Sequence, residues 1–188
     1  NSAGTGLTWA DAFTNLHTAL ESVSGCAELW VAAGTYTAGN SPFQLRSTVA
    51  LYGGFSGIET NRSARGWVAH PTVLTANNNA DLLDNNGLAA PIDHTAVLDG
   101  FVISGGGSFA AMQNFNASPT IRNCTFTGNT VYAVLNSGGS PVFTACAFSN
   151  NAAGAVYNFQ TSVAFEQCLF QANGGTNQYV GAILNQGA

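Results

Sequence analysis

The sequence predicts a parallel β-helix, a rod in which each short strand pairs with its equivalent one turn later. Two observations predict this fold. The second half of the chain repeats with a period of about 22 residues, and each repeat holds about three short runs of alternating residues that Gly, Asn and Ser interrupt. No helix of ten or more residues fits inside such a unit, so one repeat corresponds to one turn of a solenoid.

The N-terminal segment, residues 1–28, is expected to hold one amphipathic helix. The stretch TWADAFTNLHTALESVSG has apolar residues at helical spacing, and Thr8 forms a capping-box-like pair with Asp11. Gly25 supplies the stop. We expect the helix to cover the first turn of the rod, where apolar side chains and strand edges would otherwise be open.

Residues 29–188 are expected to form the rod, as one structural domain with the helix. The runs AELWVAAGTY and FQLRSTVALYGGF have the two-residue alternation of strands. A loop over residues 56–71 follows them. The remaining length has room for about seven turns and a rod of roughly 35 Å, because parallel strands lie about 4.8 Å apart.

Two series of residues define the repeat. In one, a cysteine stands two residues before a phenylalanine. In the other, an asparagine returns at the same interval, with a five-residue insertion before its last member. The members are Cys124, Cys146 and Cys168, then Phe126, Phe148 and Phe170, and then Asn114, Asn136, Asn158 and Asn185. Because both series share one period, they indicate stacked turns.

The cysteine series has three interpretations. Stacked equivalents would have Cα atoms about 4.8 Å apart, which a disulfide tolerates, but identical side-chain directions make the required torsion unfavourable. Three thiols in a line cannot surround a tetrahedral zinc ion, and these repeats contain no histidine. We favour free thiols that pack as small hydrophobic groups, with a disulfide and a metal site as the alternatives.

The asparagine series is interpreted as a ladder of amides in turns, since asparagine tolerates the left-handed conformation and can bond to its equivalents above and below. A row of ligand-binding amides is the alternative. One residue earlier in each repeat, Leu135, Tyr157 and Leu184 would form an outward apolar column, and an exposed apolar stripe marks an interaction surface. With the opposite strand parity, the column would belong to the core.

The composition excludes some classes of function. Charged residues make up only 7% of the chain, there is no lysine, and the net charge is −5. A nucleic-acid backbone would therefore be repelled. No apolar run approaches the roughly 18 residues that a membrane-spanning helix needs, so we expect no membrane insertion by this segment.

The sequence offers little for catalysis. Carbohydrate-active enzymes place clustered carboxylates on one face, and here no pair of carboxylates lies one turn apart on the expected outward positions. We therefore expect a non-enzymatic protein with no cofactor. Within NNNADLLDNNG, the residues Asn79, Asp81 and Asp84 could surround a calcium ion, which prefers oxygen ligands, but a solvated loop is the favoured interpretation.

The loop at residues 56–71 has two interpretations. Arginine and tryptophan are common in binding hot spots, so Trp67 and its neighbours could form a recognition site. The favoured alternative is a self-packed loop, in which Trp67 covers the side of the rod and Glu59 pairs with an arginine.

Several motifs resemble a known family. The segments GTGLTWADAFTNLHTAL, LWVAAGTYTAG, FQLRSTVALYGGFSGIETNRS, PTVLTAN and SPTIRNCTFTGN are similar to those of bacterial secreted and surface right-handed β-helix proteins, including polymorphic outer-membrane-protein-like repeats. The resemblance covers nearly the whole chain. It implies a right-handed three-sheet β-helix, export to the cell surface or medium, and a longer parent chain.

These observations lead to one expected function and one alternative. We expect an extracellular structural or adhesive module that self-associates or binds other surface proteins or glycans. Its open last turn or its apolar column is a candidate route to filaments. The alternative, motivated by the fold and by aromatic residues such as Trp67 and Tyr157, is a carbohydrate-binding or carbohydrate-active β-helix.

Overall fold

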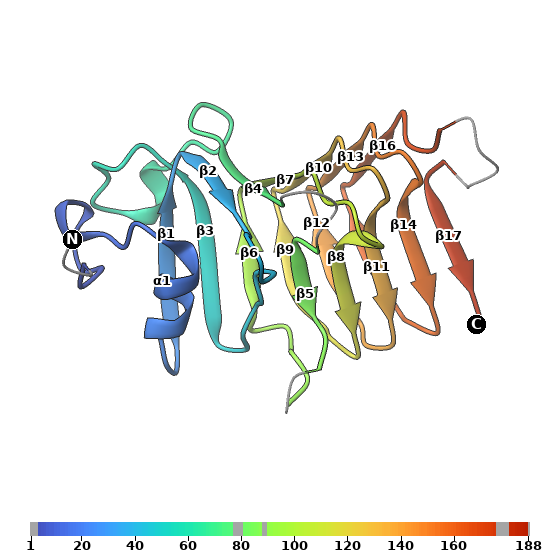
Figure 1. Ribbon diagram of the computed structural model, residues 1–188, viewed down its shortest axis with the longest axis horizontal. Helices are drawn as coiled ribbons and strands as arrows, with labels where there is room; N and C mark the ends of the chain where they lie inside the picture. Colours follow the sequence, from blue (N-terminus) through green and yellow to red (C-terminus); the bar gives the residue numbers. More distant parts are fainter. Residues whose placement is uncertain (1–3, 77–80, 88–89, 176–180, 188) are drawn as a thin grey trace.

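The computed structural model describes residues 4–76, 81–87, 90–175 and 181–187. These residues form a rod of three parallel sheets, with the N-terminal and C-terminal parts of the chain at opposite ends (Figure 1). Every inter-strand pairing along the rod is parallel and joins one turn to the next. The period in the sequence therefore corresponds to one turn of the rod.

Sheet A contains β1 (Ala27–Ala32), β3 (Val49–Phe55), β6 (Val97–Asp99), β9 (Thr120–Arg122), β12 (Val142–Thr144) and β15 (Ala164–Glu166). Sheet B contains β2 (Gly34–Thr37), β4 (Thr72–Thr75), β7 (Phe101–Ser104), β10 (Thr125–Thr127), β13 (Ala147–Ser149) and β16 (Leu169–Gln171). Sheet C contains β5 (Leu83–Asn85), β8 (Ala110–Phe115), β11 (Tyr132–Ser137), β14 (Gly154–Phe159) and β17 (Ile183–Gln186).

The rod has about six turns, one fewer than expected, because sheets A and B hold six strands each within the described residues. The second turn is responsible. Ala50 of β3 pairs with Val97 of β6, whereas Thr120 of β9 pairs with Val142 of β12 only 22 residues later. The loop at residues 56–71 takes up much of that long turn.

The N-terminal helix is shorter than predicted and begins later. A 3₁₀ helix, η1 (Trp9–Asp11), precedes α1 (Leu16–Ser22), and the predicted cap at Thr8 makes no side-chain bond. Asn15 caps α1 instead, since its side chain accepts bonds from two backbone N–H groups of the first turn. Trp9 packs on Phe55 at 5.5 Å, and this contact directs η1 toward sheet A.

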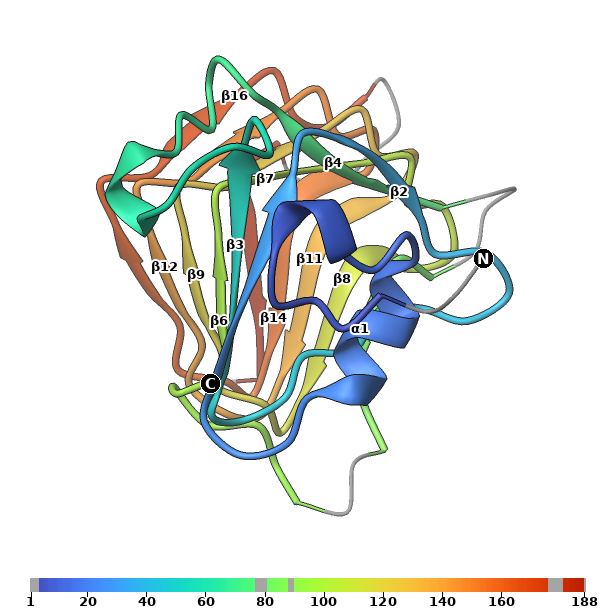
Figure 2. The same ribbon diagram turned by 90° about the vertical axis from the view of Figure 1, so that its left-hand side faces the viewer.

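Helix α1 lies at the N-terminal end of the rod, on the side of sheet C (Figure 2). Its buried residues Leu16, Ala19 and Leu20 belong to the same hydrophobic core as the rod. The neighbouring His17 stacks on Phe43 with ring centroids 4.5 Å apart. The helix is therefore packed against the first turns and is not a separate unit.

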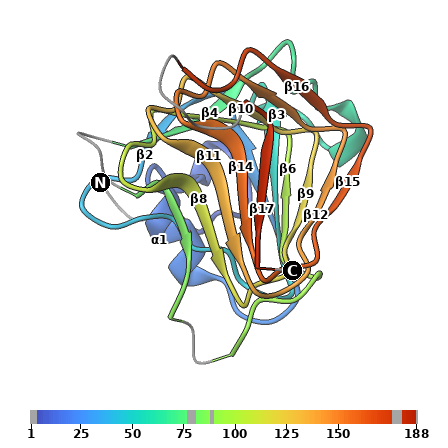
Figure 3. The ribbon, with the colours of Figure 1, turned by 90° about the vertical axis from the view of Figure 1, so that its right-hand side faces the viewer.

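Stacked side chains fill the rod. The ring of Phe148 lies parallel to those of Phe126 and Phe170, with centroids 4.9 Å apart in both pairs. Phe143 and Phe165 stack in the same way from sheet A. Figure 3 shows the C-terminal end, where the last described turn has a neighbour on one side only. For that reason Phe170 is half-buried while its two equivalents are fully buried.

Left-handed residues form the corners between sheets. At the corner between sheets A and B, φ lies between 50° and 83° at four equivalent positions, which are Gly100, Asn123, Ala145 and Gln167. The backbone ladder continues through this corner, since the N–H of Asn123 donates to the carbonyl of Thr144 at 3.0 Å. At this corner the chain turns at these four positions, whereas the asparagines of the predicted series lie in strands.

Candidate functional site

The predicted asparagine series forms a buried hydrogen-bonded ladder inside sheet C. Each amide nitrogen donates to the side-chain oxygen of the next member at 2.8 or 2.9 Å, from Asn114 through Asn136 and Asn158 to Asn185. The prediction that these residues lie in turns is wrong, because they occupy strands and face inward. The structure adds Asn85 at the start of the ladder.

A second amide ladder was not predicted. Asn129 donates to Asn151 and Asn151 donates to Asn173, both at 2.7 Å. Each amide also donates to a backbone carbonyl of the preceding turn, such as that of Phe126. The signal was present in the sequence, since these asparagines are also 22 residues apart. Both ladders satisfy their amides internally, so they are structural.

The cysteines are free thiols in the described structure. Cys124 and Cys146 are buried, and Cys168 in the last described turn is half-buried. Cys124 and Cys146 donate to backbone carbonyls of the preceding turn, both at 3.6 Å. A hydrogen bond with the Cys124 thiol, together with burial, raises the pKa of Cys146. A buried thiol that stays protonated is neither a nucleophile nor a metal ligand.

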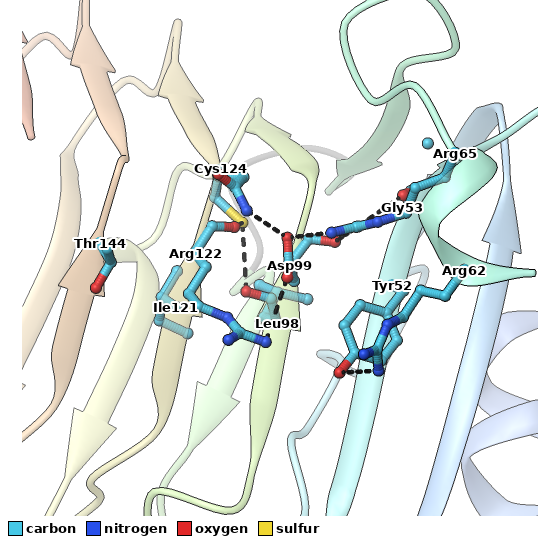
Figure 4. A network of polar contacts seen from close by, with 12 residues as sticks. Tyr52, Gly53, Arg62, Arg65, Leu98, Asp99, Ile121, Arg122, Cys124 and Thr144 are labelled. Carbon is cyan, nitrogen blue, oxygen red and sulfur yellow. Dashed lines mark hydrogen bonds and ion pairs between the residues drawn. The ribbon is translucent and has the colours of Figure 1, made fainter. Parts of the chain in front are cut away.

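Three of the four arginines lie in one polar network on the outer face of sheet A (Figure 4). Arg65 pairs with Asp99 at 2.7 Å, and Arg122 approaches the other oxygen of Asp99 at 3.3 Å. Arg62 pairs with Glu28 and bonds to the hydroxyl of Tyr52. The network attaches the loop at residues 56–71 to the sheet.

The loop packs on the rod, and one predicted contact in it is wrong. Glu59 does not pair with an arginine in the described structure. Burial would raise the pKa of Glu59, but hydrogen bonds from the backbone and hydroxyl of Ser56 and from the following N–H groups lower it to about 2. Glu59 therefore stabilises the start of the loop.

Trp67 lies on the side of the rod with 38% of its surface exposed, and Arg65 stacks over its ring at 4.9 Å. The loop can lie this close because residue 54 is glycine, where a Cβ would come within 2.5 Å of the Trp67 Cα. A cleft of about 560 Å³ opens beside this loop, and its lining residues are Glu28, Asn61, Arg62, Ser63, Arg65 and Trp67. Its charged side chains already pair with protein groups, so its contacts are those of a structural clamp.

A groove of about 450 Å³ lies on the outer face of sheet C. Its lining residues are Asp81, Ser108, Phe109, Gln113, Phe115, Leu135, Ser137, Tyr157 and Phe159. Phe109 is 62% exposed and Phe159 is 37% exposed. We refer to this set of residues as the sheet C groove.

The register of sheet C explains the shape of the groove. Ser137 of β11 pairs with Phe115 of β8 on one side and with Phe159 of β14 on the other. Two residues earlier on the same face, Leu135 lies between Gln113 and Tyr157. Small or short side chains on the middle strand therefore form a floor between taller side chains on the flanking strands.

Several contacts hold the walls of the groove in place. The ring of Tyr157 packs on that of Tyr132 at 5.6 Å, and its hydroxyl donates to Gln186. On the opposite wall, the amide of Gln113 donates to the carboxylate of Asp81 at 2.7 Å. These contacts within the chain fix the positions of the groove walls.

The predicted apolar column has the outward parity that we expected, but it is not a uniformly exposed stripe. Leu135 is only 5% exposed because the neighbouring strands cover it, and Tyr157 is half-buried. Leu184 lies on β17, where it pairs with Tyr157 of β14, and it does not line the groove. The sequence did not indicate the contribution of the phenylalanines one position after the ladder asparagines.

The calcium hypothesis gains no support from the structure. Asn79 lies outside the described residues. Asp81 accepts from Gln113, and Asp84 accepts from the backbone of Asn86 at 3.0 Å. Burial, and to a lesser degree the nearby Asp81 charge, raise the pKa of Asp84. Within the described residues, no group of three acidic, histidine or cysteine side chains could hold a metal ion.

The three parallel sheets and their one-turn pairing define a β-solenoid. Residues 22–187 match the family model for the right-handed β-helix region, so the chain belongs to the right-handed β-helix family. The predicted fold class, a right-handed three-sheet β-helix with an N-terminal helix, is confirmed. Searches of curated proteins and of solved structures gave no match.

A relationship to bacterial polymorphic outer-membrane-protein-like repeats stays a prediction. In the part of the chain that the structure describes, no helix is both long and apolar enough to cross a membrane.

Proposed function

We propose that the chain is a non-enzymatic, extracellular adhesive module that makes its contacts through the sheet C groove. The groove itself is the observation that carries this proposal. Exposed apolar patches mark interaction surfaces, and here rings such as Phe109 and Phe159 are exposed beside walls that are already ordered. The low charge of the chain and its resemblance to surface proteins support an extracellular location.

A substitution at the floor of the groove tests the proposal. Ser137→Phe would place a third ring between Phe115 and Phe159, fill the groove and leave the core untouched, because residue 137 faces outward. Leu169→Ala is the matched control, since Leu169 is 58% exposed on the outer face of sheet B.

The measurement uses beads coated with the purified chain. The beads are tested for aggregation with one another and for retention on panels of immobilised extracellular proteins and glycans. We expect aggregation or specific retention that Ser137→Phe abolishes and Leu169→Ala preserves. The proposal is wrong if coated beads show neither behaviour, or if the Ser137→Phe beads behave like the unmodified ones.

A carbohydrate-active enzyme is the second candidate. The observation that favours it is the position of two carboxylates, Asp81 and Asp84, on the β5 side of an aromatic groove, with a raised pKa at Asp84. Incubation with neutral and acidic polysaccharides distinguishes the two. Release of reducing ends that Asp84→Asn abolishes would replace the adhesive proposal with this one.

A further inference from the structure

We infer that the sheet C groove binds an organic cation, namely an ammonium group that carries methyl or methylene substituents, between its aromatic walls and beside Asp81. This inference rests on the proposed function, because it names the chemistry of the group that the adhesive face would hold. It follows from the ring arrangement, the local charge and the order of the walls.

The rings have a suitable spacing for a cation. Phe115 and Phe159 stand on strands that are two inter-strand steps apart, so their backbones are separated by about 9.6 Å, with Ser137 between them. A group held midway above Ser137 would lie roughly 5 Å from each aromatic column. Cation–π attraction operates within about 6 Å of a ring centroid.

The local charge is negative. Asp81 lines the groove, and Asp84 stands next to Gln113 on the adjoining strand β5. No arginine or histidine is among the lining residues in the described structure. Three of the four arginines belong to the network on the outer face of sheet A, and the chain has no lysine. A cation entering the groove therefore meets the Asp81 carboxylate, which no basic side chain of the lining neutralises.

The charge and the lining residues of the groove favour a cation over an anion or a purely apolar ligand. An anion would be repelled by Asp81 and would find no basic side chain among the lining residues. A purely apolar ligand would desolvate the Asp81 carboxylate without compensation, which costs free energy. A methylated ammonium group satisfies both the rings and the carboxylate, and this combination is how aromatic cages recognise such groups.

Contacts within the chain also hold the walls of the groove in place. Gln113 orients one oxygen of Asp81, and Tyr157 is held between the ring of Tyr132 and the side chain of Gln186. The walls lose little conformational freedom when a ligand enters, which favours affinity for a small group.

Choline and 3,3-dimethylbutan-1-ol are the probes, since they have nearly the same shape and only choline is charged. Both are titrated into the isotopically labelled chain at constant ionic strength, and backbone amide shifts are followed by NMR. We expect choline to shift signals of β8, β11 and β14, and the alcohol to bind at least about fivefold more weakly. Asp81→Asn should weaken choline binding by a similar factor, and Ser137→Phe should abolish it, whereas Leu169→Ala should bind as the unmodified chain does.

Three results would overturn the inference. The alcohol could bind as tightly as choline, which would make the groove simply apolar. Cellohexaose could shift the same signals while choline shifts none, which would make it a glycan site. Choline binding could also persist in a folded Ser137→Phe variant. If Ser137→Phe abolishes bead adhesion but choline does not bind, the cation inference fails while the adhesive proposal stands.

Discussion

Arg65 and Asp99 form an ion pair at 2.7 Å, with only 8% and 6% of their side chains exposed. Arg65 also donates to the backbone carbonyls of Gly53 and Asp99 at 3.0 and 2.9 Å. The pair joins a loop to strand β6, which begins about thirty residues later. The Asp99 carboxylate serves two arginines, because Arg122 approaches its other oxygen.

Asp99→Ala should therefore destabilise the chain by about 3–5 kcal/mol, because it leaves the buried Arg65 without a counter-charge. Urea unfolding measures the loss. Trypsin should also cleave faster after Arg62 and Arg65 as the loop detaches. Glu28→Gln is the control, since the Glu28–Arg62 pair is exposed and should contribute less than about 1 kcal/mol. Equal losses in the two variants would contradict this account.

Asn136→Ala should cost about 2–4 kcal/mol in free energy of unfolding. It removes the acceptor of the Asn114 amide and the donor to the Asn158 oxygen, and unsatisfied buried polar groups are costly. Asn185→Ala, at the exposed end of the ladder, should cost less than about 1 kcal/mol because water can replace its contact. Thermal and urea unfolding of both variants check the order. Similar losses of unfolding free energy in the two variants would show that burial of the amides in the ladder does not stabilise the chain.

Iodoacetamide should label Cys26 rapidly in the folded chain and leave Cys124 and Cys146 unmodified, because the first is exposed and the other two are buried. The raised pKa of Cys146 further lowers its thiolate fraction. Peptide mass spectrometry after timed labelling gives the rates, and labelling in urea provides the reference in which all four react. A reducing agent should leave the unfolding curve unchanged. A shift in the curve would reveal a disulfide.

The stabilising contribution of Glu59 should be lost as the pH falls from about 4.5 to about 2. Its pKa is lowered from 4.5 to about 2 in the folded state, so its contribution is fully present above the unfolded pKa and is lost as the pH falls through the folded pKa. Glu59→Gln should show a flatter dependence of melting temperature on pH in this interval. Parallel curves for the two proteins would refute the assignment.

The period of the sequence was sufficient to predict the architecture. Equivalent positions such as Cys124 and Cys146 stack because the regular turns in the second half of the chain have nearly the same length, and the alternation of each run decides which side chains face the core. For Leu135 and Tyr157 the alternation left both parities open, and the structure places them on the outer face. The later start of α1 could not be predicted as easily, since the contact of Trp9 with Phe55 directs the first residues elsewhere.

The groove was only partly predictable. The alternation Phe115, Ser137, Phe159 is visible in the sequence at intervals of 22 residues, one position after the ladder asparagines. Its meaning appears only when Ser137 is seen between two phenylalanines and Asp81 is found beside Gln113. Asp81 lies outside the regular repeat, so no periodicity places it at the groove.

The sequence by itself determined the period and the stacking of equivalent residues in the regular turns, because these depend on local alternation and on a nearly constant turn length. Only the tertiary structure decided which charges meet and where the surface is hollowed. Arg65 reaches Asp99, and Asp81 reaches Gln113, through irregular segments of the long second turn. Contacts made by such segments depend on how the chain closes in space, and spacing along the sequence does not encode them.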